Sequence, residues 1–68
     1  MSLTPAKLRE ERERDHIPAR DIAARLGRTA DWLRKLERGK VGWQRRKGEQ
    51  VWEAIRAIQR ERAARIGG

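Results

Sequence analysis

The chain has 68 residues and carries 18 Lys and Arg against 10 Asp and Glu, which gives a formal net charge of +8. A chain of this length forms one domain. It contains no cysteine, which excludes disulfides and thiolate metal sites. No apolar run is long enough to span a bilayer, and the start lacks the pattern of an export signal. We therefore expect no contact with a membrane.

The positive charge is concentrated in the middle of the chain. Residues 1–27 contain six basic and five acidic groups, residues 28–48 contain eight and two, and residues 49–68 contain four and three. A solvated surface normally mixes both signs, whereas a surface of one sign attracts a polyanion. The pattern therefore favours a polyanionic partner for the middle segment.

The first predicted helix begins after Thr4, a favourable N-cap, with Pro5 at its first position. We expect it to extend to about residue 15, with Leu8 facing inward and His16 at its end. The other residues of this helix form a charged face with neighbours of opposite sign.

Two short helices are predicted next. Pro18 begins the second helix and Gly27 ends it, while Thr29 caps the third and Gly39 ends it. The inward positions are Ile22, Ala23 and Leu26 in the second helix and Leu33 and Leu36 in the third. Residues from about 19 to 38 thus have the layout of a DNA-binding helix-turn-helix.

The segment 40–48, KVGWQRRKG, contains three consecutive basic residues and two Gly, and we expect a basic loop or a very short hairpin. Residues from about 49 to 66 show a helical apolar stripe, which consists of Val51, Trp52, Ile55 and Ile58. Together the elements predict an all-α fold, a compact bundle of four helices, or of five if the last helix divides.

No group of residues indicates catalysis. The chain has one histidine and one serine, without a catalytic triad, a metal-ligand spacing or a phosphate-binding loop. We therefore expect no enzymatic activity and no cofactor, metal ion or small-molecule ligand. Trp52 is expected in the core, Trp32 at the core edge or against a nucleic-acid backbone, and Trp43 against nucleic acid or as a lid over the core.

The chain from Leu8 to Gly39 resembles the small helix-turn-helix domains of phage repressors and Cro proteins, the XRE-like family. The matching positions are Leu8, Arg12, Ile17, Ile22, Ala23, Leu26, Gly27, Thr29, Leu33, Leu36 and the Glu37-Arg38-Gly39 ending. The turn at residues 27–29 is also similar to that of Myb-like phage and resolvase modules. The resemblance implies a lambda-repressor-like bundle that binds double-stranded DNA in the cytoplasm of a bacterium or a phage-infected cell, at the nucleoid.

The resemblance also implies roles for individual residues. The positions that reach base edges in the family are here Ala30, Asp31, Arg34 and Lys35. Arg34 or Lys35 can donate hydrogen bonds to guanine, and Ala30 can contact a thymine methyl group. Asp31 can accept a hydrogen bond from cytosine N4, or it only stabilises the helix N-terminus through the helix dipole. Phosphate contacts are expected from Arg20, Arg28, Thr29, Lys40, Trp43, Arg45, Arg46 and Lys47. Arg12 and Glu37 occupy positions that pair in the family, so a partly buried ion pair is expected between them.

These features predict a sequence-specific transcriptional regulator that reads the major groove with its third helix. Because one half-site gives little specificity, we expect a homodimer on a pseudo-palindrome, held through Ile58, Ala63 and Ile66 of the last helix. One alternative is an excisionase-like architectural factor whose segment 40–48 enters the minor groove as a wing. Another is a protein-interaction module of the anti-repressor type, and an RNA-binding protein is the least favoured.

Overall fold

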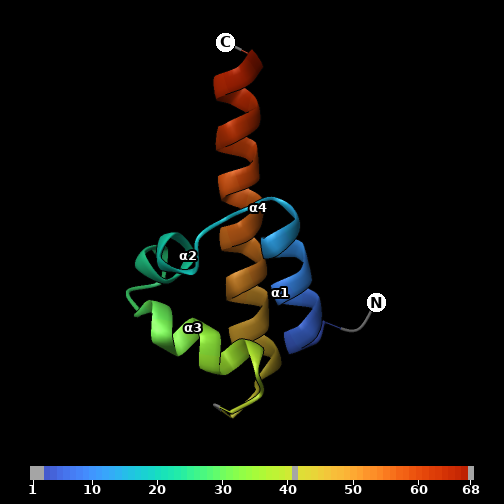
Figure 1. Ribbon diagram of the computed structural model, residues 1–68, viewed down its shortest axis with the longest axis vertical. Helices are drawn as coiled ribbons and strands as arrows, with labels where there is room; N and C mark the ends of the chain where they lie inside the picture. Colours follow the sequence, from blue (N-terminus) through green and yellow to red (C-terminus); the bar gives the residue numbers. More distant parts are fainter. Residues whose placement is uncertain (1–2, 41, 68) are drawn as a thin grey trace.

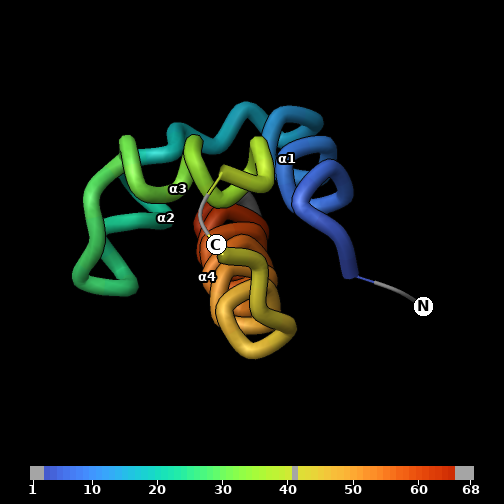
Figure 2. The backbone as a smooth tube through the Cα atoms, turned by 90° about the horizontal axis from the view of Figure 1, so that it is seen from below, coloured from blue at the N-terminus to red at the C-terminus, as the bar shows by residue number. Residues whose placement is uncertain are grey.

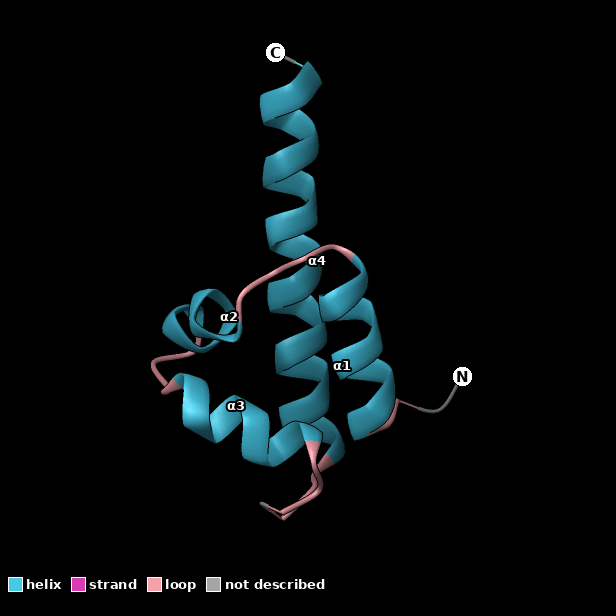
Figure 3. Cartoon of the chain, in the orientation of Figure 1, coloured by secondary structure: helices cyan, strands magenta, loops and turns pink. Residues whose placement is uncertain are grey.

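The computed structural model describes residues 3–40 and 42–67, the last two as helix backbone only, and within these ranges the chain forms four helices and no strand (Figures 1 and 3). They are α1 (Pro5–Arg14), α2 (Ala19–Arg25), α3 (Ala30–Glu37) and α4 (Arg45–Gly67). The predicted all-helical class is therefore confirmed. In this part of the chain, no helix combines the length and the apolar character needed to cross a membrane.

Hydroxyl groups cap the beginnings of α1 and α3. Thr4 Oγ1 accepts a hydrogen bond of 3.1 Å from the backbone N–H of Lys7, and Thr29 Oγ1 accepts one of 3.1 Å from that of Trp32. Each bond satisfies an N–H group that has no partner within its own helix. α2 begins after Pro18 instead, whose φ of −63° fixes the entry without a side-chain cap.

Three helices end with one residue in the left-handed conformation. Gly27 after α2 has φ +68° and Gly39 after α3 has φ +73°, and His16 takes the same position after α1 with φ +54°. The N–H of the next residue reaches back five positions each time, as from Ile17 to the Arg12 carbonyl oxygen at 3.1 Å. This is the Schellman arrangement, in which glycine is the usual residue. His16 adopts it without the steric freedom of glycine.

The core lies where the four helices meet. α4 packs against α1 and α2, and α3 packs against α1 and α2. Figure 2, which looks along α4, shows α1 on one side of that helix and α2 and α3 on the other. Each fully buried aliphatic side chain contributes about 1.5–3 kcal/mol of stability. The large residues in this class are Leu8, Ile17, Ile22, Leu33, Leu36, Val51 and Ile55.

The last helix begins earlier than predicted. We expected a basic loop through residue 48, but Arg45, Arg46, Lys47 and Gly48 form the first turn of α4. Gly48 lies within this turn, and the ring of Trp43 packs against it, so a Cβ atom there would be 2.5 Å from Trp43 Cη2. The glycine therefore makes room for the ring. The expected hairpin is not formed by the described residues of segment 40–48, from which residue 41 is excluded.

The C-terminal half of α4 projects beyond the other helices (Figure 1). Ile58, which we expected at a dimer surface, is instead buried in the core at 8% exposure, so that expectation is wrong. Ala63 is exposed, and the side chain of Ile66 lies outside the described residues. An ion pair between Arg25 of α2 and Glu61 of α4 connects the projecting half to the rest of the molecule.

Candidate nucleic-acid interface

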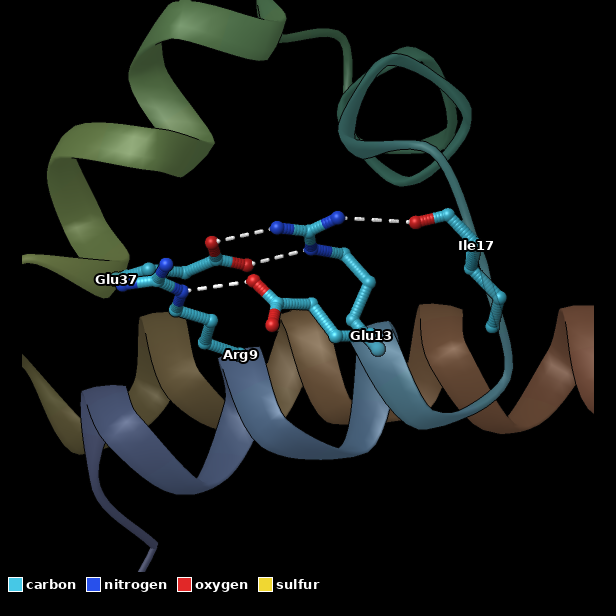
Figure 4. Close-up of polar contacts among 5 residues, drawn as sticks. Arg9, Glu13, Ile17 and Glu37 are labelled. Atoms are coloured by element: carbon cyan, nitrogen blue, oxygen red, sulfur yellow. Dashed lines mark hydrogen bonds and ion pairs between the residues drawn. The ribbon is translucent and has the colours of Figure 1, made fainter.

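A bidentate ion pair between α1 and α3 fixes the end of α3 (Figure 4). Arg12 Nε donates to Glu37 Oε2 at 2.7 Å and Nη2 donates to Oε1 at 2.9 Å, while Nη1 donates to the Ile17 carbonyl oxygen at 3.0 Å. The side chains of Arg12 and Glu37 are 13% and 3% exposed. The hydrogen bond with Glu37 raises the pKa of Arg12, so its guanidinium stays charged. The pair expected between these residues is thus present.

α3 exposes three of the four residues that the resemblance assigns to base reading. Asp31, Arg34 and Lys35 are exposed. Ala30 is only half-exposed and packs against the core. Ala30 therefore offers only part of its methyl group to a ligand, which weakens its expected role at a thymine.

Two of the exposed α3 residues bind each other. Lys35 Nζ lies 3.0 Å from Asp31 Oδ2, and their side chains are 57% and 69% exposed. Arg34 has no ion-pair partner among the residues that the structure describes. Arg34 is therefore the predicted base-reading residue whose charge is most available to a ligand.

The turn before α3 holds a cation in place. The guanidinium carbon of Arg28 lies 5.1 Å from the ring centroid of Trp32, within the range of a cation–π interaction. Trp32 is half-buried and packs against the core, which places it at the core edge. The hydroxyl of Thr29 accepts the N–H of Trp32, and its own proton stays available to donate to a phosphate.

Three basic residues stand at an unfavourable end of a helix. Arg45, Arg46 and Lys47 form the first turn of α4, which contains no acidic residue. A helix N-terminus is the positive end of the helix dipole, and a cation there is destabilising by about 0.3–1 kcal/mol. Glu49 lies 3.2 Å from Arg45, but Arg46 and Lys47 have no ion pair within the described ranges. Folding therefore does not explain these charges.

The same end of the molecule carries most of the unneutralised charge. We call the cations of residues 28–48 the basic surface; Lys47 is half-buried and the others are exposed. They lie on α3, its flanking turns and the first turn of α4, which share one end of the molecule (Figures 1 and 2). In the described chain, the members without an ion pair are Arg28, Arg34, Arg38, Lys40, Arg46 and Lys47.

Arginines elsewhere are more often neutralised. Carboxylate pairs are formed by Arg9 with Glu13, Arg12 with Glu37, Arg14 with Glu11 and Arg25 with Glu61. The last expected phosphate contact, Arg20 on α2, is 82% exposed and lies 3.8 Å from Asp21. Segment 28–48 contains two carboxylates, and one of them, Glu37, is occupied by a cation from α1. Because Glu37 neutralises Arg12 of α1 and not a cation of segment 28–48, the basic surface keeps a larger excess of positive charge.

Trp43 and Trp52 cover the core instead of standing free. Both are half-buried and pack against the core side chains. For Trp43, which was also expected to contact phosphate, the lid is the alternative that the packing supports. Trp52 is less buried than expected for a core residue.

Sequence reasoning missed the role of Glu11. Its side chain was assigned to the charged face of α1, but the residue is only 7% exposed. Its Oε1 accepts hydrogen bonds from Arg14 at 2.6 Å and from Gln59 Nε2 at 3.3 Å. Its position three residues after Leu8, on the inward side of the helix, was the available signal.

Comparison of the chain with family models, with curated proteins and with solved structures finds no match. Within the described chain, no three His, Asp or Glu side chains gather closely enough to hold a metal ion. A hollow of about 350 Å³ lies between α2 and the projecting half of α4. The Arg25–Glu61 pair lines this hollow, which is separate from the basic surface.

Proposed function

We propose that this protein binds double-stranded DNA as a transcriptional regulator, with α2 and α3 as a helix-turn-helix and α3 in the major groove. One observation carries the proposal. The cations of the basic surface have few carboxylate partners, and three of them stand at the unfavourable end of α4. A polymer with closely spaced negative charges would satisfy them, and DNA offers one charge per about 1.7 Å of duplex axis.

The size and support of α3 suit base reading. Its eight residues give a length of about 12 Å at 1.5 Å per residue, and the major groove accepts a helix. Leu33, Leu36 and Glu37 anchor its inward face, so the exposed face is presented rigidly. Arg34 can donate two hydrogen bonds to guanine O6 and N7, the commonest specific contact of arginine.

The flanking cations would hold the two DNA strands. Arg28 and Thr29 precede α3, Lys40 follows it, and the first turn of α4 adds Arg45, Arg46 and Lys47. At that turn the helix dipole and the side-chain charges both attract a phosphate. Such contacts fix the register of the protein on DNA without reading sequence. Arg20 at the start of α2 would add a further phosphate contact.

The salt dependence of binding to a random-sequence duplex tests the proposal. If about six phosphates are neutralised, log K falls against log salt with a slope of about −5. Arg46→Ala should reduce the steepness of the slope by about one. Arg60→Ala removes the same charge from the projecting half of α4 and should leave the slope unchanged. Negligible binding at low salt would overturn the proposal and favour a protein-interaction module.

Selection of bound sequences from a randomised duplex pool tests base reading. We expect a consensus, and Arg34→Ala should relax one of its positions with a loss of about 1–3 kcal/mol. Failure of the wild-type protein to select any consensus would instead indicate architectural binding. The wing that we considered for such a factor is not available from residues 45–48, because they are helical.

A homodimer on a pseudo-palindromic site is part of the proposal, because a single module reads one half-site. The projecting turns of α4, where Ala63 is exposed, supply a surface outside the core. Sedimentation of the protein on its selected duplex should give two chains per duplex. One chain per duplex at saturation would remove the dimer from the proposal.

A further inference from the structure

Asp31 is an exposed carboxylate in the first turn of α3, one of the elements that carry the basic surface. Segment 28–48 contains only Asp31 and Glu37 as acidic residues, and Glu37 is bound to Arg12 at 3% exposure. Asp31 is 69% exposed and lies 3.0 Å from the ammonium of Lys35. The carboxylate thus neutralises one of the cations that would otherwise face DNA.

A carboxylate at this position distinguishes between base pairs. On a phosphate-binding surface it is repelled by the DNA backbone, and in the major groove it is repelled by the acceptors of guanine and thymine. Cytosine N4 carries an amino group that a carboxylate can accept from, whereas the amino group of adenine N6 stands beside the acceptor N7, which repels a carboxylate. Residues one turn apart have Cβ atoms about 5–6 Å apart, so Asp31 and Lys35 can reach the same base pair or neighbouring ones.

Building on the proposed function, we infer that the Asp31–Lys35 ion pair is the element that discriminates the specific site from other DNA. On other sequences the pair stays closed, and Lys35 adds little to phosphate binding. On the specific site the pair opens at a C·G base pair or step. Asp31 then accepts a hydrogen bond from cytosine N4, and Lys35 donates to guanine O6 or N7. Both charges then have partners on the base edges.

The test compares wild-type protein with Asp31→Asn on two duplexes, the selected site and a random sequence of equal length. Asn keeps the size of the side chain and removes its charge. We expect Asp31→Asn to bind random DNA more tightly, with a salt slope steeper by about 0.9 because Lys35 is released to a phosphate. The ratio of the two affinities should fall tenfold or more. A C·G position in the wild-type consensus should become degenerate.

Glu49→Gln is the matched control. It breaks an exposed pair of the same spacing, with Arg45 at 3.2 Å, and removes the same charge from an element assigned to phosphate binding. It should tighten binding to both duplexes by the same factor and leave the consensus unchanged. Equal behaviour of Asp31→Asn and Glu49→Gln, or a wild-type consensus without a C·G position, would overturn the inference.

A second pair of variants separates ion pairing from simple repulsion. In a Lys35→Ala background, Asp31→Asn should lose most of its gain in affinity for random DNA, because no lysine is released and only the repulsion between the carboxylate and the phosphates is relieved. A gain that persists in full would overturn the inference. Circular dichroism of each variant establishes that the total helix content is retained, and Asp31→Ser serves as a second substitution. Absence of any duplex binding by wild-type protein would defeat the proposed function itself, whereas an unaltered consensus in Asp31→Asn defeats only this inference.

Discussion

Replacing Glu37 by Gln keeps the size of the side chain and removes the charge that faces Arg12. One oxygen of Glu37 becomes an amide NH2 group, a donor that opposes the donors of Arg12. Arg12 now makes two charge-assisted hydrogen bonds to Glu37, of 2.7 and 2.9 Å. In the variant it keeps only one of them, together with its bond to the Ile17 carbonyl oxygen. Breaking one side of a buried ion pair costs about 3–5 kcal/mol. Because Arg12 is 13% exposed and can recruit water, we expect about 3 kcal/mol.

Such a loss is large for this chain. At 0.05–0.15 kcal/mol per residue, a domain of 68 residues has a total stability of about 3–10 kcal/mol. Urea unfolding followed by circular dichroism measures the change. With a slope of about 1 kcal/mol per molar urea, the midpoint of Glu37→Gln should fall by about 3 M.

Two variants control this experiment. Glu13→Gln breaks the exposed pair with Arg9, which has a distance of 2.8 Å, and should leave the midpoint nearly unchanged. A double variant with Arg12→Met and Glu37→Leu removes both charges and should be more stable than Glu37→Gln, since no buried charge is left unpaired. A midpoint for Glu37→Gln that matches that of Glu13→Gln would refute the reasoning.

Three further predictions follow from local geometry. His16→Gly should stabilise the protein by about 0.5–1 kcal/mol, because a non-glycine residue is strained at φ +54°; a lower melting temperature for this variant would contradict the assignment. Gly48→Ala should destabilise the wild-type chain, because the new methyl group displaces Trp43. In a Trp43→Ala chain the same substitution should increase stability by about 1 kcal/mol, because alanine favours a helix more than glycine does. An equal effect in both chains would disprove the packing of Trp43 on Gly48. The hydrogen bond from Arg25 lowers the pKa of Glu61 below its ordinary value of 4.5. The pair therefore stabilises the fold above pH 4.5 and is lost as the pH falls through the lowered value. An NMR titration of Glu61 should show this midpoint, which returns to the ordinary range in Arg25→Gln.

Local signals in the sequence were sufficient for the first three helices. Thr4, Pro18 and Thr29 begin them, and Gly27 and Gly39 end two of them, because capping depends on neighbouring backbone groups. The start of α4 was missed for the opposite reason. Gly48 resembles a helix breaker until the ring that lies against it is known, and that contact is tertiary.

The candidate site was predictable in part. The charge count located the basic segment, and the resemblance supplied the Arg12–Glu37 pair. The i, i+4 spacing of Asp31 and Lys35 was an available signal for their ion pair. The sequence did not reveal that Ala30 is partly covered or that Arg45 and Arg46 stand on a helix. These features depend on side-chain conformation and on the true beginning of α4.

The continuous α4 is a rigid spacer of known length between the two ends of the molecule. Its 23 residues extend about 35 Å at 1.5 Å per residue, from the first turn with Arg45 to the far end of the molecule (Figure 1). A dye or a surface tether attached to its last turn would sit away from the basic surface. Immobilised in this way, the protein would keep that end accessible, and energy transfer to a dye on a bound duplex would report its orientation.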